Sequence, residues 1–206
     1  MSPRVVTSLT AGLLLAGLLG GSAGGAWAQD TPVPVELQVQ IMVKILNFDR
    51  KLPERVGGRL TVGVLYQGRY RTSANVGGEV CRTLMGLPRA ALGALETLQL
   101  SCLAIDLDET PDLAAALKRE RIQVLYVSPL RAFAVEDVVA LTRAGRITTL
   151  TGVPRYVETG CAIGVDMKGD RPEILINLPA SRAEGAELNA QLLKLARVVG
   201  NPAAGT

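Results

Sequence analysis

The sequence predicts a single α/β domain with a mainly parallel sheet, helices on both faces and an antiparallel hairpin near the C-terminus. Short, mostly apolar segments alternate with helix-type segments as far as residue 151. Of the side chains, 48% are apolar and 20% are charged, which is typical of a folded globular chain. The length of 206 residues fits one such domain.

The predicted elements follow one another in regular order. Four apolar runs predict strands, over residues 60–66, 97–106, 123–127 and 147–151. Apolar side chains at helical spacing predict helices over residues 36–48, 72–85, 113–121, 135–144 and 186–199, and Pro88 is expected to open a further short helix. In the last of these, residues 186–199, the apolar face contains Leu188, Leu192, Leu195 and Val199.

Turn and capping residues mark the boundaries of these elements. Residues 51–58 are expected to break the first helix, Thr72 or Ser73 to cap the second, and Gly145 to end the helix at 135–144. Pro111 is expected at the first helical position of residues 113–121. Two late strands, 162–167 and 173–178, are joined by Lys168-Gly169-Asp170-Arg171, which is typical of a hairpin.

Residues 1–28 are predicted to be a secretory signal peptide that is cleaved off. Arg4 and the free amine form a positive start, residues 9–26 are apolar, and Ala26-Trp27-Ala28 forms a small-x-small cleavage site. The alternative, a membrane anchor, fits less well because the apolar run is short and rich in glycine. We therefore expect residues 29–206 to be the mature domain and to lie in the periplasm.

The composition argues against most catalytic classes. The chain contains no histidine, which excludes Ser–His–Asp and Cys–His catalysis and most zinc or iron sites. The 22 basic residues barely exceed the 19 acidic ones, and no basic run favours nucleic acid. We expect a protein that is not an enzyme, with no cofactor, no metal and no nucleic-acid partner. A hydrolase that uses Asp, Glu, Lys, Tyr or Cys is a remote third alternative.

Three cysteines follow the predicted cleavage site: Cys81, Cys102 and Cys161. An odd number leaves at least one free thiol per chain or requires an intermolecular bridge. Cys81 and Cys102 lie in adjacent elements and could form a disulfide, or they could be buried reduced cysteines. Cys161 could respond to redox conditions.

Candidate ligand-binding residues lie where the parallel strands end, because ligands bind outside the carboxyl ends of such strands. Gln67, Arg69 and Arg71 lie in a loop before a helix, where free amides attract anions, and Ser128 and Thr151 end later strands. The alternative is an ordinary solvated loop.

Four carboxylates, Asp106, Asp108, Glu109 and Asp112, follow the second strand but lack the spacing of a calcium loop. Ser128 has no nucleophile-elbow motif, which favours a turn over a catalytic role.

Several segments of the C-terminal half carry a family pattern. They are Ile122–Ser128, Ile147–Pro154, Gly160 with Ala162–Val165, Ile174–Leu178 and Leu192–Val199. This pattern resembles the YfiR-like family of secreted bacterial proteins. Three positions differ from the family pattern: Leu52-Pro53 stands in place of Trp-Pro, Thr151-Gly152 in place of Ser-Asp, and Cys161 in place of a glycine.

The resemblance implies a compact, often dimeric periplasmic protein. It further implies that the protein represses a membrane-bound diguanylate cyclase by binding its periplasmic sensor domain. We expect the periplasmic domain of a sensor kinase as the alternative partner. By analogy, Leu52, Pro53, Val153 and Tyr156 are candidate partner-binding residues. The alternative function is a periplasmic protein that binds a small molecule or anion at the strand ends and serves a transporter or receptor.

Overall fold

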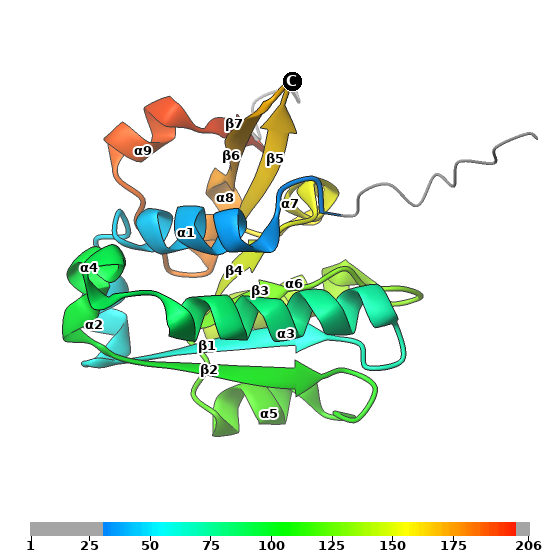
Figure 1. Ribbon diagram of the computed structural model, residues 1–206. Helices are drawn as coiled ribbons and strands as arrows, with labels where there is room; N and C mark the ends of the chain where they lie inside the picture. Colours follow the sequence, from blue (N-terminus) through cyan, green and yellow to red (C-terminus); the bar gives the residue numbers. More distant parts are fainter. Residues whose placement is uncertain (1–30, 201–206) are drawn as a thin grey trace, which may run out of the picture.

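The computed structural model describes residues 31–200, so the predicted signal peptide lies outside the described residues. A seven-stranded sheet in the order β2-β1-β3-β4-β5-β6-β7 forms the centre of the domain (Figure 1). Strands β1 to β5 are parallel, β6 is antiparallel to β5, and β7 is parallel to β6. This architecture confirms the predicted α/β class and the late antiparallel hairpin.

The elements up to the third strand are α1 (Val35–Leu46), α2 (Leu52–Val56), β1 (Arg59–Tyr66), α3 (Arg71–Gly86), α4 (Arg89–Leu92), the 3-10 helix η1 (Gly93–Thr97), β2 (Gln99–Asp106), α5 (Leu113–Arg119) and β3 (Val124–Val127). They are followed by α6 (Val135–Gly145), β4 (Thr148–Thr151), α7 (Pro154–Thr159), β5 (Ile163–Lys168), β6 (Arg171–Asn177), α8 (Leu178–Ala183), α9 (Ala190–Leu195) and β7 (Arg197–Val199).

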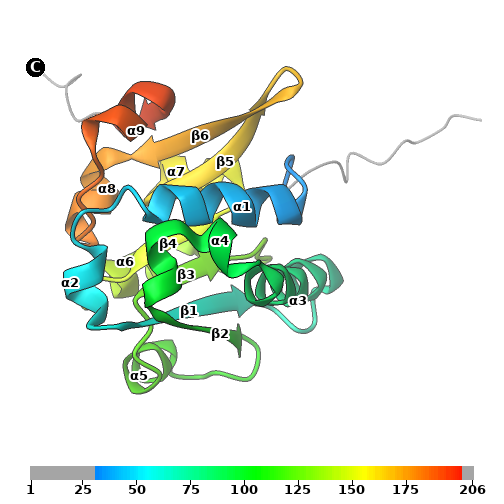
Figure 2. The same ribbon diagram turned by 60° about the vertical axis from the view of Figure 1, so that its left-hand side comes forward.

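Both faces of the sheet are covered, because the central strands carry apolar side chains on both sides. In β3, Val124 and Tyr126 pack toward α1 and α3, whereas Leu125 and Val127 pack toward α5 and α6. Figures 1 and 2 show α1 and α3 on one side of the sheet and α5 on the other. Near-continuous apolar strands are expected for parallel strands that are buried on both faces.

A buried polar contact fixes α1 against the sheet. The Gln38 side chain donates to the Val33 carbonyl (2.6 Å) and accepts from the Tyr126 hydroxyl (2.7 Å). A side chain at Gly152, just after β4, would collide with the Gln38 amide. Glycine at 152 therefore allows the end of the sheet to approach α1 closely.

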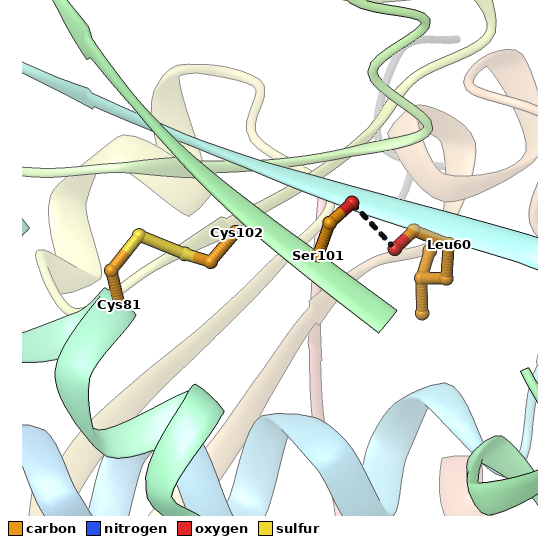
Figure 3. Close-up of a disulfide and its surroundings, with 4 residues drawn as sticks. All are labelled: Leu60, Cys81, Ser101 and Cys102. Carbon is orange, nitrogen blue, oxygen red and sulfur yellow. Dashed lines mark hydrogen bonds between the residues drawn. A yellow bond between two sulfur atoms is a disulfide. The ribbon is translucent and has the colours of Figure 1, made fainter. Parts of the chain in front are cut away.

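A disulfide ties the edge strand β2 to α3. Cys81 and Cys102 are bonded, with their Cα atoms 5.6 Å apart (Figure 3). Beside them, the Ser101 hydroxyl donates to the Leu60 carbonyl of β1 (3.5 Å). The edge of the sheet is thus held both covalently and through its neighbour strand.

The predicted helix boundaries were wrong in three places. Ser73 does not cap α3; the helix begins at Arg71, and the Ser73 hydroxyl instead accepts from the Gln67 N–H (2.9 Å). Pro111 precedes α5, and the Asp112 carboxylate caps the helix by accepting from the Ala115 N–H. The helix predicted over residues 135–144 extends one residue further, to Gly145, and Arg146, with a φ of 52°, follows as its C-cap.

The predicted final helix over residues 186–199 was also wrong. Only α9 is helical, and Arg197–Val199 forms β7 beside β6. Valine is β-branched and favours strands, and β6 offers an open edge with which the chain can pair. Three short helices, α2, α7 and α8, were not predicted, because each is at most six residues long and shows too little periodicity.

Candidate functional site

The loop at the end of β1 is held by carboxylates of the chain itself. The N–H groups of Gly68 and Asp108 donate to the Asp106 carboxylate (2.9 and 3.0 Å), and the Arg69 N–H donates to Asp108 (2.8 Å). These negative charges occupy the amides that an anion would need and repel it. The Asp106 and Asp108 carboxylates therefore already occupy the predicted anion site, although the side chains of Arg69 and Arg71 are exposed.

The other predicted ligand residues meet at the same edge, since β1, β3 and β4 are neighbours. The Gln67 side chain accepts from the Arg131 N–H (2.6 Å). Thr151 donates its hydroxyl to the Val127 carbonyl (2.9 Å). The Ser128 hydroxyl is fully buried and has no hydrogen-bond partner among residues 31–200. A ligand at this edge would have to displace internal hydrogen bonds to reach the side chains of Gln67 and Thr151.

Three of the four acidic residues at and after the end of β2 have structural roles. Asp106 and Asp108 close the β1 loop, and Asp112 caps α5. Within residues 31–200, no group of three or more acidic or cysteine side chains lies close enough together to hold a metal ion.

Three of the four candidate partner residues are in the interior. Leu52 anchors α2 in the core, and Val153 and Tyr156 are buried against α6. The Tyr156 hydroxyl accepts from the Leu130 N–H (2.9 Å). These three side chains cannot form a contact surface in this structure, and only Pro53 is exposed. Their expected role rested on analogy with a family motif, and such a motif does not show which side chains are buried.

The large apolar side chains that are exposed in the described residues lie elsewhere, namely Met85, Phe133, Leu195 and Val198. Leu195 is the most accessible of them, at 74%. It was expected on the buried face of a continuous final helix, but the helix ends at Leu195, the chain changes to β7, and Leu195 is exposed. The pair Val198-Val199 was the sequence signal for this change.

A buried carboxylate lies where α8, α6 and β4 meet. Glu184 is fully buried and accepts hydrogen bonds from the Thr149 N–H (2.7 Å), the Thr149 hydroxyl (2.9 Å) and the Thr142 hydroxyl (3.1 Å). No ion pair holds it in the described residues. Burial raises the pKa of Glu184 to about 7, against the lowering effect of its hydrogen bonds with Thr149 and Thr142 and the nearby Arg143. Sequence reasoning did not single out Glu184.

Cys161 lies next to this cluster and is fully buried. Burial, together with the nearby Glu184 carboxylate, raises the pKa of the Cys161 thiol to about 12. Because the thiolate is the reactive form, this cysteine is inert at neutral pH, which argues against the redox-responsive interpretation.

The comparison that decides the family concerns the C-terminal half. A family model described as YfiR/HmsC-like matches residues 89–197, which is more than half of the chain. The chain belongs to the YfiR/HmsC-like family. The matched region extends from α4 into β7 and includes Cys161, Glu184 and Leu195. No curated protein matches the chain.

Two solved structures share the fold of this YfiR/HmsC-like protein at low sequence identity. The ABC domain in complex with L-Trp from Streptococcus pneumonia has a TM-score of 0.54 and 15% identity, over 78% of this chain and 60% of that one. A conserved domain protein from Vibrio cholerae has a TM-score of 0.52 and 14% identity, over 80% and 60%. The chain thus spans about three fifths of each, and the likeness concerns the fold alone. No helix within residues 31–200 is long and apolar enough to cross a membrane.

Proposed function

We propose that this protein is a periplasmic, non-enzymatic regulator that represses a membrane-bound diguanylate cyclase by binding the periplasmic domain of the cyclase. The observation that carries the proposal is the family match over residues 89–197. The absence of histidine from the sequence and the predicted signal peptide are consistent with it. A sensor kinase is the alternative partner.

Repression of this kind is a shift between two states of the partner. The regulator must bind the inactive state of the cyclase more tightly than the active state, and the ratio of the two affinities sets the degree of repression. A signal that reduces this ratio restores cyclic-di-GMP synthesis. No catalytic group of the regulator is needed.

For the partner surface, we propose the end of α9 and the adjoining β7. Leu195 and Val198 are exposed apolar side chains three residues apart, and Leu195 lies inside the family-matched region. We infer that these two side chains contribute to one exposed apolar patch, because such patches are typical of protein interaction sites. This surface replaces Leu52, Val153 and Tyr156, which are buried.

Deleting the gene and measuring cellular cyclic-di-GMP tests the proposal. We expect the level to rise on deletion and to return when the wild-type gene is supplied. Leu195→Asp should fail to restore repression, whereas Met85→Asp should restore it, because Met85 is also exposed (54%) but belongs to α3 and not to the proposed surface. An unchanged level after deletion would refute the regulatory function. Restoration by Leu195→Asp would refute only the surface.

The alternative, a small-molecule carrier that uses the strand-end edge, is not favoured by the contacts of Gln67, Thr151 and the Asp106 loop. Thermal-shift measurements on the mature protein with small anions separate the two functions. A ligand whose effect is lost in Ser128→Val would support the carrier function.

A further inference from the structure

A polar hollow lies at the opposite, amino-terminal edge of the sheet. Its volume is about 700 Å³, and its lining contains four basic side chains, Lys51, Arg55, Arg146 and Arg182, and two acidic ones, Glu54 and Glu187. Three separate segments contribute these residues: α2 with the residue before it, the turn between α6 and β4, and α8 with the connection that follows it. The strand-end edge considered in the sequence analysis is not involved.

Arg55 and Asp49 hold the walls of the hollow together. The Arg55 guanidinium donates to the Asp49 carboxylate (2.6 Å), the Thr148 hydroxyl (3.0 Å), and the carbonyls of Arg146 (3.2 Å) and Glu184 (3.3 Å). The Asp49 carboxylate also accepts from the N–H groups of residues 51 and 187 (3.1 and 2.9 Å). The hollow is therefore organised before any ligand arrives.

Gly185 lies between two of the arginines. A Cβ atom built at Gly185 would lie 3.6 Å from the side chains of both Arg146 and Arg55, so these two side chains flank the glycine. The φ of Gly185 is +86°, which side-chain-bearing residues rarely adopt. The backbone conformation, and not a lack of space, therefore favours glycine at position 185.

The remaining charges leave two guanidinium groups available. Lys51 pairs with Glu187 (3.2 Å) and Arg55 pairs with Asp49 (2.6 Å). Within residues 31–200, neither Arg146 nor Arg182 takes part in an ion pair, and both are exposed around a hollow in which Glu54 is the acidic side chain left without an ion pair. The excess charge is positive. Guanidinium groups recognise carboxylates and phosphates through paired hydrogen bonds.

We propose that this hollow binds a small molecule through a carboxylate or phosphate group held by Arg146 and Arg182. Such a site goes beyond the proposed partner binding and gives the protein a place for a small-molecule signal. The site lies near the amino-terminal end of β4, because the Arg55 guanidinium donates a hydrogen bond to Thr148, the first residue of that strand.

Binding is tested on the mature protein, residues 29–206, with inorganic phosphate and acetate as separate probes. The melting temperature is followed while each probe replaces chloride at constant ionic strength, so that general screening does not contribute. We expect a saturable rise with at least one probe, and the stronger of the two identifies the chemical class. In the double variant Arg146→Gln and Arg182→Gln, the affinity should fall at least tenfold.

A double variant of two other exposed arginines, Arg82→Gln and Arg171→Gln, is the matched control and should bind as the wild type does. The single variants Arg146→Gln and Arg182→Gln should each weaken binding several-fold, which keeps the test valid if the double variant folds poorly. The proposal would be overturned if the melting temperature of the wild type changed only in proportion to the chloride removed and never reached a plateau. Equal affinity in the Arg146 and Arg182 double variant would also overturn it. Neither result depends on the protein partner.

Discussion

Replacing Glu184 by glutamine should make the protein more stable at neutral and alkaline pH. The side chain keeps its shape, and its amide can still accept from the Thr149 N–H and donate to the Thr142 hydroxyl. What disappears is a negative charge that is fully buried and has no ion-pair partner in the described residues. A buried charge without a cation opposes folding.

The magnitude follows from the shift in pKa. The pKa of Glu184 is raised from 4.5 to about 7, so the folded protein holds the proton more tightly than the unfolded chain. This contribution to stability is fully present below pH 4.5 and is lost as the pH rises through 7. At about 1.4 kcal/mol per pKa unit, the free energy of unfolding of the wild type should fall by about 3 kcal/mol as the pH rises through this range. The Glu184→Gln variant should not show this fall.

Urea unfolding of both proteins from pH 4.5 to pH 8.5, with the disulfide intact, measures this difference. The two proteins should have similar free energies of unfolding at the acid end, and the variant should gain an advantage of about 3 kcal/mol above pH 7. Glu158→Gln is the control, because Glu158 is exposed, and it should show no pH-dependent difference. A difference between Glu184→Gln and wild type that stays constant over this range would refute the reasoning.

Two further predictions concern stability. Replacing Cys81 and Cys102 by serine should lower the free energy of unfolding by about 3 kcal/mol, because the bond closes a 21-residue separation; an unchanged urea midpoint would contradict this. Gly152→Ala should destabilise the fold by about 1–3 kcal/mol, because the new methyl group would collide with the buried Gln38 amide. Gly78→Ala, in α3 with open space around it, should instead stabilise by up to about 1 kcal/mol, and equal melting temperatures for the two variants would argue against the collision.

The sequence patterns predicted the order of strands and longer helices because these elements repeat a local periodicity. The hairpin at residues 168–171 is an example: Lys168 pairs with Arg171 around a two-residue turn, as its glycine and aspartate indicate. The disulfide was one of two open interpretations, since spacing alone does not show whether two cysteines approach each other. The structure joins them across α3 and β2.

The features that the patterns missed depend on contacts between distant segments. Leu195 was expected to be buried because residues 186–199 continue a helical apolar spacing. Instead the helix ends at Leu195, the chain continues into β7 beside β6, and the Leu195 side chain is exposed. No sequence pattern singled out Glu184, and only the folded chain shows Thr142 and Thr149 around it. The hollow around Arg146 and Arg182 likewise combines residues from three parts of the chain.

Synthesis of cyclic-di-GMP from GTP by the purified, detergent-solubilised membrane cyclase, titrated with the mature protein, tests the regulatory proposal most directly. We predict that the rate of synthesis falls to a plateau as the concentration of residues 29–206 increases. The Leu195→Asp variant should require a much higher concentration for the same effect. A rate that stays constant at saturating concentrations of the wild-type protein would contradict the proposal.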